Sequence, residues 1–172
     1  QKTLNPNICI ITNNTIETLY LEKIKLFLKK INNIQKVIHI SIPDGESYKT
    51  QEQLTKIWTE LLESKMPRNL TTVISLGGGV VTDIAGFAAS TYKRGADVVH
   101  IPTSLLAQVD AAIGGKTAIN HALGKNMIGT FYQPKAVILS AEFLNTLPDR
   151  EFNSAMSEAI KYGLIWDTNF YD

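Results

Sequence analysis

The sequence predicts an α/β fold, a Rossmann-like and mostly parallel sheet with helices on both faces. Apolar, β-branched runs that resemble buried strands alternate with segments that carry apolar residues at helical spacing. Glycine or proline ends several of these runs. Strands without polar alternation, each separated from the next by a helix, are typical of a parallel sheet that is covered on both sides.

The first part of the chain reads as strand, helix, strand, helix. Residues 7–12 form an apolar run, and apolar side chains recur at helical spacing over residues 15–31. A second β-branched run covers residues 37–42 and stops before Pro43. Residues 50–65 again show helical spacing. We therefore expect two parallel strands, each followed by a helix.

The next strands end in turns of unusual composition. Residues 72–76 form a strand that three glycines end, and residues 80–92 read as a helix of small residues. Residues 98–101 are a strand stopped by Pro102, and residues 136–140 are a further strand. Sheets of this kind bind ligands at the carboxyl ends of their strands, so these turns are the expected functional region.

Composition narrows the class of protein. The 172 residues are 44% hydrophobic and 19% charged, which excludes intrinsic disorder, and their formal charge is +1. That balance excludes a bulk electrostatic attraction for nucleic acid or for a membrane surface. No apolar stretch has the length of a membrane span. Cys9 is the only cysteine, so we expect no disulfide framework and a reducing, cytoplasmic setting.

Acidic residues follow the second strand. Asp44, Gly45 and Glu46 form a turn, and Lys49 comes shortly after it. A carboxylate at this place in a nucleotide-binding sheet accepts hydrogen bonds from a ribose diol. A solvated turn explains the same residues, because acid–glycine pairs are common turn formers.

Three glycines, residues 77–79, join the third strand to the next helix. Glycine lets the backbone approach a ligand closely, and the helix N-terminus offers N–H donors to a pyrophosphate. Gly77 and Gly79 match the dinucleotide fingerprint G-x-G-x-x-G, but Thr82 occupies its third glycine position. Cofactor binding and a tight packing turn both remain open from these residues.

Hydroxyl groups and charges follow the fourth strand. Thr103 and Ser104 stand at its end, and Asp110 precedes the segment that carries Lys116. Asp110 occupies a position where a phosphate-binding P-loop requires glycine, which excludes a nucleoside triphosphatase of that type. Because Asp110 lies in an apolar stretch, we expect either a role in a site or a salt bridge with Lys116.

Two more segments carry charges. Lys125 and Asn126 lie in a loop bracketed by glycines, where they offer donors to phosphate or hydroxyl groups. Glu158 and Lys161 are three residues apart on the last predicted helix and share a face. An exposed ion pair within the helix explains this second pair equally.

These segments occur together, in this order, in one enzyme family. The chain resembles the 3-dehydroquinate synthases, the NAD-dependent sugar phosphate cyclases of the shikimate pathway. The matching motifs cover residues 43–46, 77–83, 92–95, 102–110, 114–117, 120–129 and 158–163.

The resemblance implies a set of residues for each ligand. The NAD-binding residues are expected to be Asp44, Gly45, Glu46, Lys49, Gly78, Gly79, Val80, Asp83, Thr103, Ser104, Lys116, Lys125, Phe143 and Thr146. The catalytic residues are expected to be Arg94, Asp110, Lys116, Asn126 and Lys161. Within that set, Lys116 and Asn126 contact the substrate, and Arg94 reaches the phosphate site of the neighbouring subunit of a homodimer. Glu158 is the expected ligand of Zn²⁺ or Co²⁺.

The resemblance also implies a reaction, the conversion of 3-deoxy-D-arabino-heptulosonate 7-phosphate to 3-dehydroquinate and phosphate. Hydride passes from C5 to NAD, phosphate is eliminated, the hydride returns, the ring opens, and an intramolecular aldol step closes the carbocycle. Two alternatives share the glycine-rich turn. One is a polyol dehydrogenase that uses NAD and a metal, and the other is a cyclase that forms aminocyclitols.

We expect the chain to be a piece of a longer protein, because it begins at Gln1 without methionine and stops straight after a helical pattern. Residues 1–150 are expected to form the NAD-binding domain and residues 151–172 to begin a helical domain that binds metal and substrate. Because zinc sites normally need three protein ligands, and Glu158 supplies one, the isolated chain is expected to be inactive.

Overall fold

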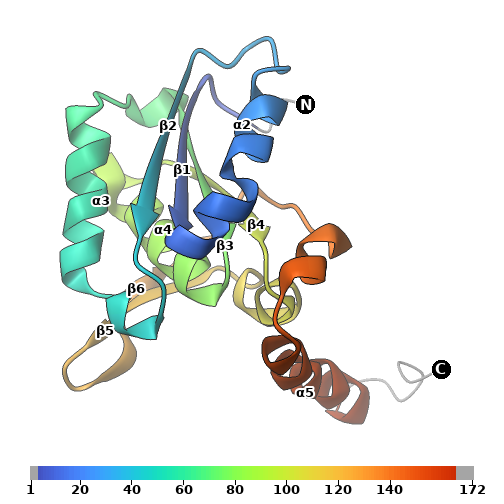
Figure 1. Ribbon diagram of the computed structural model, residues 1–172. Coiled ribbons are helices and arrows are strands. Elements are labelled where there is room, and N and C mark those ends of the chain that lie inside the picture. The colour runs from blue at the N-terminus through green and yellow to red at the C-terminus, as the bar shows by residue number, and fades with distance from the viewer. Residues whose placement is uncertain (1–3, 166–172) are drawn as a thin grey trace.

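A five-stranded sheet forms the centre of the computed structural model, which describes residues 4–165. Figure 1 shows the strands side by side with helices around them. The strand order is β2-β1-β3-β4-β7, and all four neighbouring pairs are parallel. The strands are β1 (Asn7–Asn13), β2 (Lys36–Ile42), β3 (Thr71–Gly77), β4 (Asp97–Pro102) and β7 (Ala136–Val137). The predicted α/β class with a mostly parallel sheet is therefore confirmed.

Helices connect the strands and cover both faces of the sheet. The α-helices are α1 (Asn14–Ile16), α2 (Glu22–Leu28), α3 (Gln51–Glu63), α4 (Gly79–Thr91) and α5 (Asp149–Ile165). Two π-helical turns, η1 (Glu17–Leu21) and η5 (Ala107–Ala111), and four 3₁₀ turns, η2 (Glu46–Tyr48), η3 (Arg68–Leu70), η4 (Tyr92–Arg94) and η6 (Ala141–Thr146), complete the helical elements. Among the described residues, none of these helices has both the length and the apolar character to cross a membrane.

Alternate residues of each strand supply two hydrophobic cores, because successive side chains of a strand point to opposite faces. In β1, Cys9 and Ile11 pack with α3 and α4 on one face. Ile8 and Ile10 pack on the other face with the first helical segment and with Phe143 of η6. These four β1 side chains are fully buried, so β1 lies between the two cores.

The first helix differs from the prediction in its length and its buried face. Helical structure covers α1, η1 and α2 and ends at Leu28, although the sequence predicts a helix to residue 31. Leu19 and Phe27 belong to the apolar side chains whose helical spacing predicts the buried face, but they are 45% and 62% exposed, whereas Leu21 is buried. The π-helical turn adds a residue to one turn and thereby rotates the buried face.

An antiparallel hairpin replaces the glycine-bracketed loop that the sequence predicts around Lys125 and Asn126. The hairpin consists of β5 (Lys116–His121) and β6 (Gly124–Phe131). It packs against α4 where Thr117 faces Gly86, and a Cβ atom at Gly86 would collide with the Thr117 side chain. The loop prediction is therefore wrong, and the strand predicted over residues 136–140 is shortened to β7.

Candidate active site

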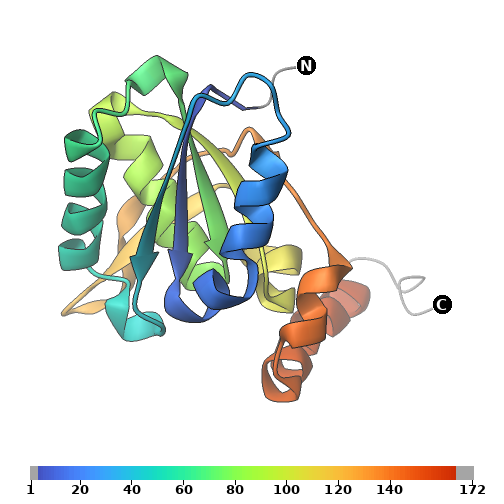
Figure 2. The same ribbon diagram turned by 45° about the horizontal axis from the view of Figure 1, so that its top comes forward.

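The predicted turns meet at the carboxyl edge of the sheet (Figure 2). β2 lies on one side of β1 and β3 lies on the other, so the sheet grows in opposite directions from β1. Such a topological switch point forms a crevice in which parallel sheets bind ligands. The glycine turn after β3 is placed at this point.

Asp44 connects the turn after β2 to the turn after β1. One carboxylate oxygen accepts a hydrogen bond from the Asn13 side chain, and the other accepts from Thr15 Oγ1 at 3.0 Å. The intervening Gly45 has a φ of +112°, a conformation that favours glycine. Both oxygens of Asp44 are thus engaged within the protein.

Lys49 joins residues that the resemblance assigned to different parts of the site. Its ammonium group, in a residue that is 3% exposed, lies 2.9 Å from Asp83 Oδ2 and 3.3 Å from Glu46 Oε1. It also donates to Asn126 Oδ1. A buried cation requires such partners. Burial raises the pKa of Asp83, and the hydrogen bond from Lys49 opposes that shift without cancelling it.

The glycine turn is a close-packed cradle. A Cβ atom at Gly77 would lie 2.7 Å from Val81 Cγ2, and one at Gly78 would lie 3.3 Å from Ser104 Oγ. A Cβ atom at Gly79 would be 3.3 Å from Ala111 Cβ. Because α4 begins at Gly79, the first N–H groups of the helix, including that of Val80, lie beside this cradle. The N-terminus of a helix is a place where proteins bind anions.

Thr82, which departs from the dinucleotide fingerprint, is accommodated inside α4. Its side chain is 1% exposed, and its hydroxyl donates to the carbonyl of Gly79 at 3.0 Å. The hydroxyl group is therefore satisfied within the helix and does not occupy the cradle.

The end of β4 packs against the glycine turn. The Thr103 N–H donates to the Gly77 carbonyl at 3.0 Å, and Ser104 Oγ accepts from the Ala107 N–H at 3.3 Å. Gln108 donates to the Pro102 and Ser140 carbonyls at 3.3 and 3.0 Å. These bonds hold the π-helical turn that carries Asp110. The sequence alone predicts no separate role for Gln108. A polar residue inside an apolar stretch is the sequence signal for such a contact.

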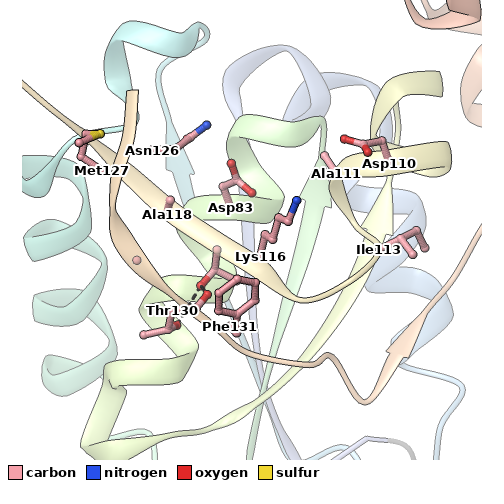
Figure 3. A pocket seen from close by; sticks show the side chains of 12 residues that line it. Asp83, Asp110, Ala111, Ile113, Lys116, Ala118, Asn126, Met127, Thr130 and Phe131 are labelled. Atoms are coloured by element: carbon pink, nitrogen blue, oxygen red, sulfur yellow. Dashed lines mark hydrogen bonds between the residues drawn. The ribbon is translucent and has the colours of Figure 1, made fainter. Parts of the chain in front are cut away.

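A cavity of about 600 Å³ opens beside these turns (Figure 3). Four predicted site residues from four different elements line it, namely Asp83, Asp110, Lys116 and Asn126. Among residues 4–165, Asp110 and Lys116 form no ion pair, so the salt bridge that was the alternative explanation of Asp110 is absent. The cavity therefore presents an ammonium, an amide and two carboxylates together.

Lys125, Phe143 and Thr146 lie outside the cavity lining. Lys125 is exposed on β6, and its charge helps to lower the pKa of Glu46. The Phe143 ring is 8% exposed and packs edge-on against Tyr20, with ring centroids 4.9 Å apart. Thr146 Oγ1 lies 2.5 Å from the Tyr20 hydroxyl. Phe143 and Thr146 thus fix η6 against the first helical segment.

Arg94 lies at the opposite, amino edge of the sheet. It lines a separate hollow of about 280 Å³ with Arg68 and Tyr132. Lys93 and Arg94 have φ values of +46° and +70°, a backbone conformation that is uncommon for residues other than glycine. Within one chain, Arg94 is therefore not brought to the cavity that holds Lys116.

Helix α5 carries the expected metal ligand. Glu158 and Lys161 form an ion pair, and the Tyr162 hydroxyl donates to the Val109 carbonyl at 3.3 Å, which holds α5 against η5. Residues 4–165 contain no group of three His, Cys, Asp or Glu side chains placed to hold a metal ion. The described residues therefore do not fit a complete zinc site, and Glu158 is engaged by Lys161.

The expected boundary between residues 150 and 151 falls in the first turn of α5. Residues 166–172 of the segment expected to begin a second domain lie outside the described residues.

Comparison with known proteins identifies relatives of this chain. The 3-dehydroquinate synthase of Shewanella pealeana is 54% identical over 167 residues, which are 97% of this chain and 45% of that protein. The chain thus spans about half the length of the curated relatives it matches.

Two solved structures share the fold. The 2-epi-5-epi-valiolone synthase of Streptomyces hygroscopicus, with NAD⁺ and Zn²⁺ bound, has a TM-score of 0.88 and 31% identity, over 96% of this chain and 46% of that one. A 2-deoxy-scyllo-inosose synthase complexed with carbaglucose-6-phosphate, NAD⁺ and Co²⁺ has a TM-score of 0.87 and 27% identity, over 94% of this chain and 44% of that one.

A family model provides the most direct assignment. Residues 39–154, more than half of the chain, match the model described as 3-dehydroquinate synthase N-terminal. The matched range contains the glycine turn, the hairpin and all four predicted site residues that line the cavity. The chain belongs to the 3-dehydroquinate synthase family and corresponds to its N-terminal part.

Proposed function

We propose that the protein formed with this chain is a 3-dehydroquinate synthase that converts 3-deoxy-D-arabino-heptulosonate 7-phosphate to 3-dehydroquinate and phosphate. This chain supplies its NAD-binding half. The observation that carries the proposal is the cavity of about 600 Å³ that Asp83, Asp110, Lys116 and Asn126 line. Ala111, which also lines the cavity, lies next to Gly79 of the glycine turn. Relatives that are 54% identical carry this name, whereas the two solved cyclases with other names are 31% and 27% identical.

The residues of this chain bind and orient the cofactor. The cradle of Gly78 and Gly79 accepts the pyrophosphate at the N-terminus of α4, and Glu46 and Asp44 accept hydrogen bonds from the ribose hydroxyl groups. Thr103 and Ser104 close the cradle from the side of β4. The chemistry that NAD supplies when bound is the temporary acceptance and later return of a hydride.

The other charged groups bind the substrate. Lys116 donates to the substrate phosphate, and its charge offsets the charge that develops there as phosphate leaves. Asp110, exposed at the rim of the cavity, accepts a hydrogen bond from a substrate hydroxyl, and Lys161 stands beside the substrate. Asn126 donates from its amide group while Lys49 holds the amide oxygen.

Further features of the whole protein are part of the proposal. Residues 1–150 form the NAD-binding domain, and residues 151–172 begin a helical domain that completes a Zn²⁺ or Co²⁺ site around Glu158. The protein is a homodimer in which Arg94 serves the phosphate site of the neighbouring subunit. The buried single cysteine supports a reducing, cytoplasmic location.

A coupled assay tests the proposal. Phosphate release and dehydroquinate formation are followed with the heptulosonate phosphate, NAD⁺ and Zn²⁺. One sample is this chain, and the other is this chain joined to the part of the Shewanella pealeana relative that lies beyond the match. We expect activity only in the longer protein. Turnover of a polyol or of a different sugar phosphate instead of the heptulosonate phosphate would contradict the proposed substrate.

A further inference from the structure

Strand β6 contains a bulge opposite Asn120. The register of the hairpin is irregular between Ile119 and His121, so that residues 125–127 of β6 stand across from Asn120 alone. Asn126, in the middle of the bulge, has a φ of +57°. A residue other than glycine keeps this left-handed backbone conformation when its surroundings hold it. Bulges next to active sites change the direction of side chains.

The Asn120 side chain holds this bulge and a second segment at once. Its Oδ1 accepts the backbone N–H of Asn126 at 2.9 Å. Its Nδ2 donates to Glu46 Oε1 at 2.8 Å and to the Glu46 carbonyl at 3.2 Å. The backbone N–H of Asn120 donates to the Lys49 carbonyl at 2.8 Å. A carboxamide is suited to this place because it offers an acceptor and two donors.

These contacts close a ring of four residues. Asn120 binds Asn126 and Glu46, and Lys49 binds the same two residues from the other side through its ammonium group. Asn126 lines the cavity, whereas Asn120 does not. Glu46 belongs to the turn after β2. Hydrogen bonds from Asn120 and Lys49 therefore connect the turn after β2 to Asn126.

We propose that Asn120 is a positioning residue that couples the cofactor turn to the substrate cavity. It keeps Asn126 in its left-handed bulge and Glu46 in its turn, so that NAD bound at the turn steadies the Asn126 amide group at the cavity. The coupling rests on the proposed function, whereas the hydrogen bonds of Asn120 exist without any ligand. We call its bond with the Asn126 N–H and its bonds with Glu46 the two arms of Asn120.

Two substitutions separate the two arms in the 172-residue chain. Asn120→Asp retains the acceptor for the Asn126 N–H and removes the donor to Glu46. Asn120→Leu has a similar volume and removes both arms. Asn32→Leu, on the exposed turn after α2, is the matched control. Circular dichroism and the slow amide exchange of the buried β1 strand verify that each variant is folded.

The first measurement is made without ligand, by NMR. We expect the amide exchange of Asn126 to accelerate about tenfold in Asn120→Leu, the factor that a typical hydrogen bond represents, and to stay unchanged in Asn120→Asp. The pKa of the Glu46 carboxyl rises in both variants, because the Asn120 donor that lowers it is lost. Unchanged exchange at Asn126 in Asn120→Leu would overturn the positioning role.

The second measurement adds NAD⁺. We expect saturating NAD⁺ to slow the exchange of the Asn126 amide in the unchanged chain and in Asn32→Leu, and to leave it unaffected in Asn120→Asp. An equal response in Asn120→Asp would contradict the coupling through Asn120. Failure of NAD⁺ to bind the unchanged chain would overturn both the coupling and the proposed cofactor role. The first measurement still tests, without NAD⁺, whether Asn120 holds Asn126 in place.

Discussion

The ammonium group of Lys49 lies 2.9 Å from the carboxylate of Asp83, and this ion pair joins the turn after β2 to the first turns of α4. Lys49 is almost completely buried, and the Asp83 side chain is 18% exposed. The pair lies beside the switch point of the sheet, so it connects the two halves of the ligand crevice.

Loss of Lys49 should destabilise the fold. Lys49→Met removes the partner of Asp83 and leaves a carboxylate largely out of water, which we expect to lower the free energy of unfolding by about 3 kcal/mol. Urea denaturation at pH 7 measures this change in the free energy of unfolding. Adding Asp83→Asn should recover part of the loss, because the orphaned charge is then absent. Lys25→Met, which breaks the surface pair with Glu22, is the control and should change little. Equal effects of Lys49→Met and Lys25→Met would refute this view.

His100 should make stability depend on pH. The ring is 2% exposed and hydrogen bonded to Ser75, and burial lowers its pKa from 6.5 to about 4. The unfolded chain therefore binds a proton that the folded chain does not. The stability that His100 contributes is complete above pH 6.5 and is lost as the pH falls towards 4, by at most about 1.4 kcal/mol per pH unit.

Urea denaturation at pH 7, 6 and 5 checks this dependence. His100→Gln should flatten the decline below pH 6.5, whereas the exposed His121→Gln should retain it. Parallel declines in all three proteins would rule out His100 as the cause.

Gly86 should be required for docking of the hairpin. Gly86→Ala places a methyl group against Thr117 Cγ2, and we expect the overpacking to lower the free energy of unfolding by about 1–3 kcal/mol. Thr117→Ser removes that methyl group but keeps the hydroxyl that donates to the Thr130 carbonyl. The double variant should recover most of the stability. Absence of rescue in the same denaturation experiment would show that Thr117 is not the obstacle.

Gly78 should be required for cofactor binding. Gly78→Val directs a branched side chain towards Ser104 Oγ and fills the cradle, so we expect NAD⁺ affinity to fall at least about tenfold, a loss of the size that overpacking causes. Isothermal titration calorimetry with NAD⁺ measures the change. Ala122→Val, exposed at the tip of the hairpin, is the control. Wild-type affinity in Gly78→Val would place the pyrophosphate elsewhere.

Local patterns predict strands β1 to β4 of the sheet and the turns that follow them. β1 to β4 agree with their predicted ranges within one residue at each end, because each strand is an apolar run that a turn former ends. β5 and β6 could not be found in this way. Every residue of β6 except Gly124 is exposed, so the strand is defined by pairing with β5 and carries no pattern of buried side chains.

The sequence by itself determined the fold class, the order of β1 to β4 with the helices between them, and the turns that carry the candidate site residues, because periodicity and turn chemistry depend on near neighbours. Only the tertiary structure decided that Lys49 binds both Asp83 and Asn126. Lys49 is 34 residues from Asp83 and 77 residues from Asn126. Contacts between such distant residues form because burying a lysine costs free energy unless the fold brings anionic and amide oxygens to it.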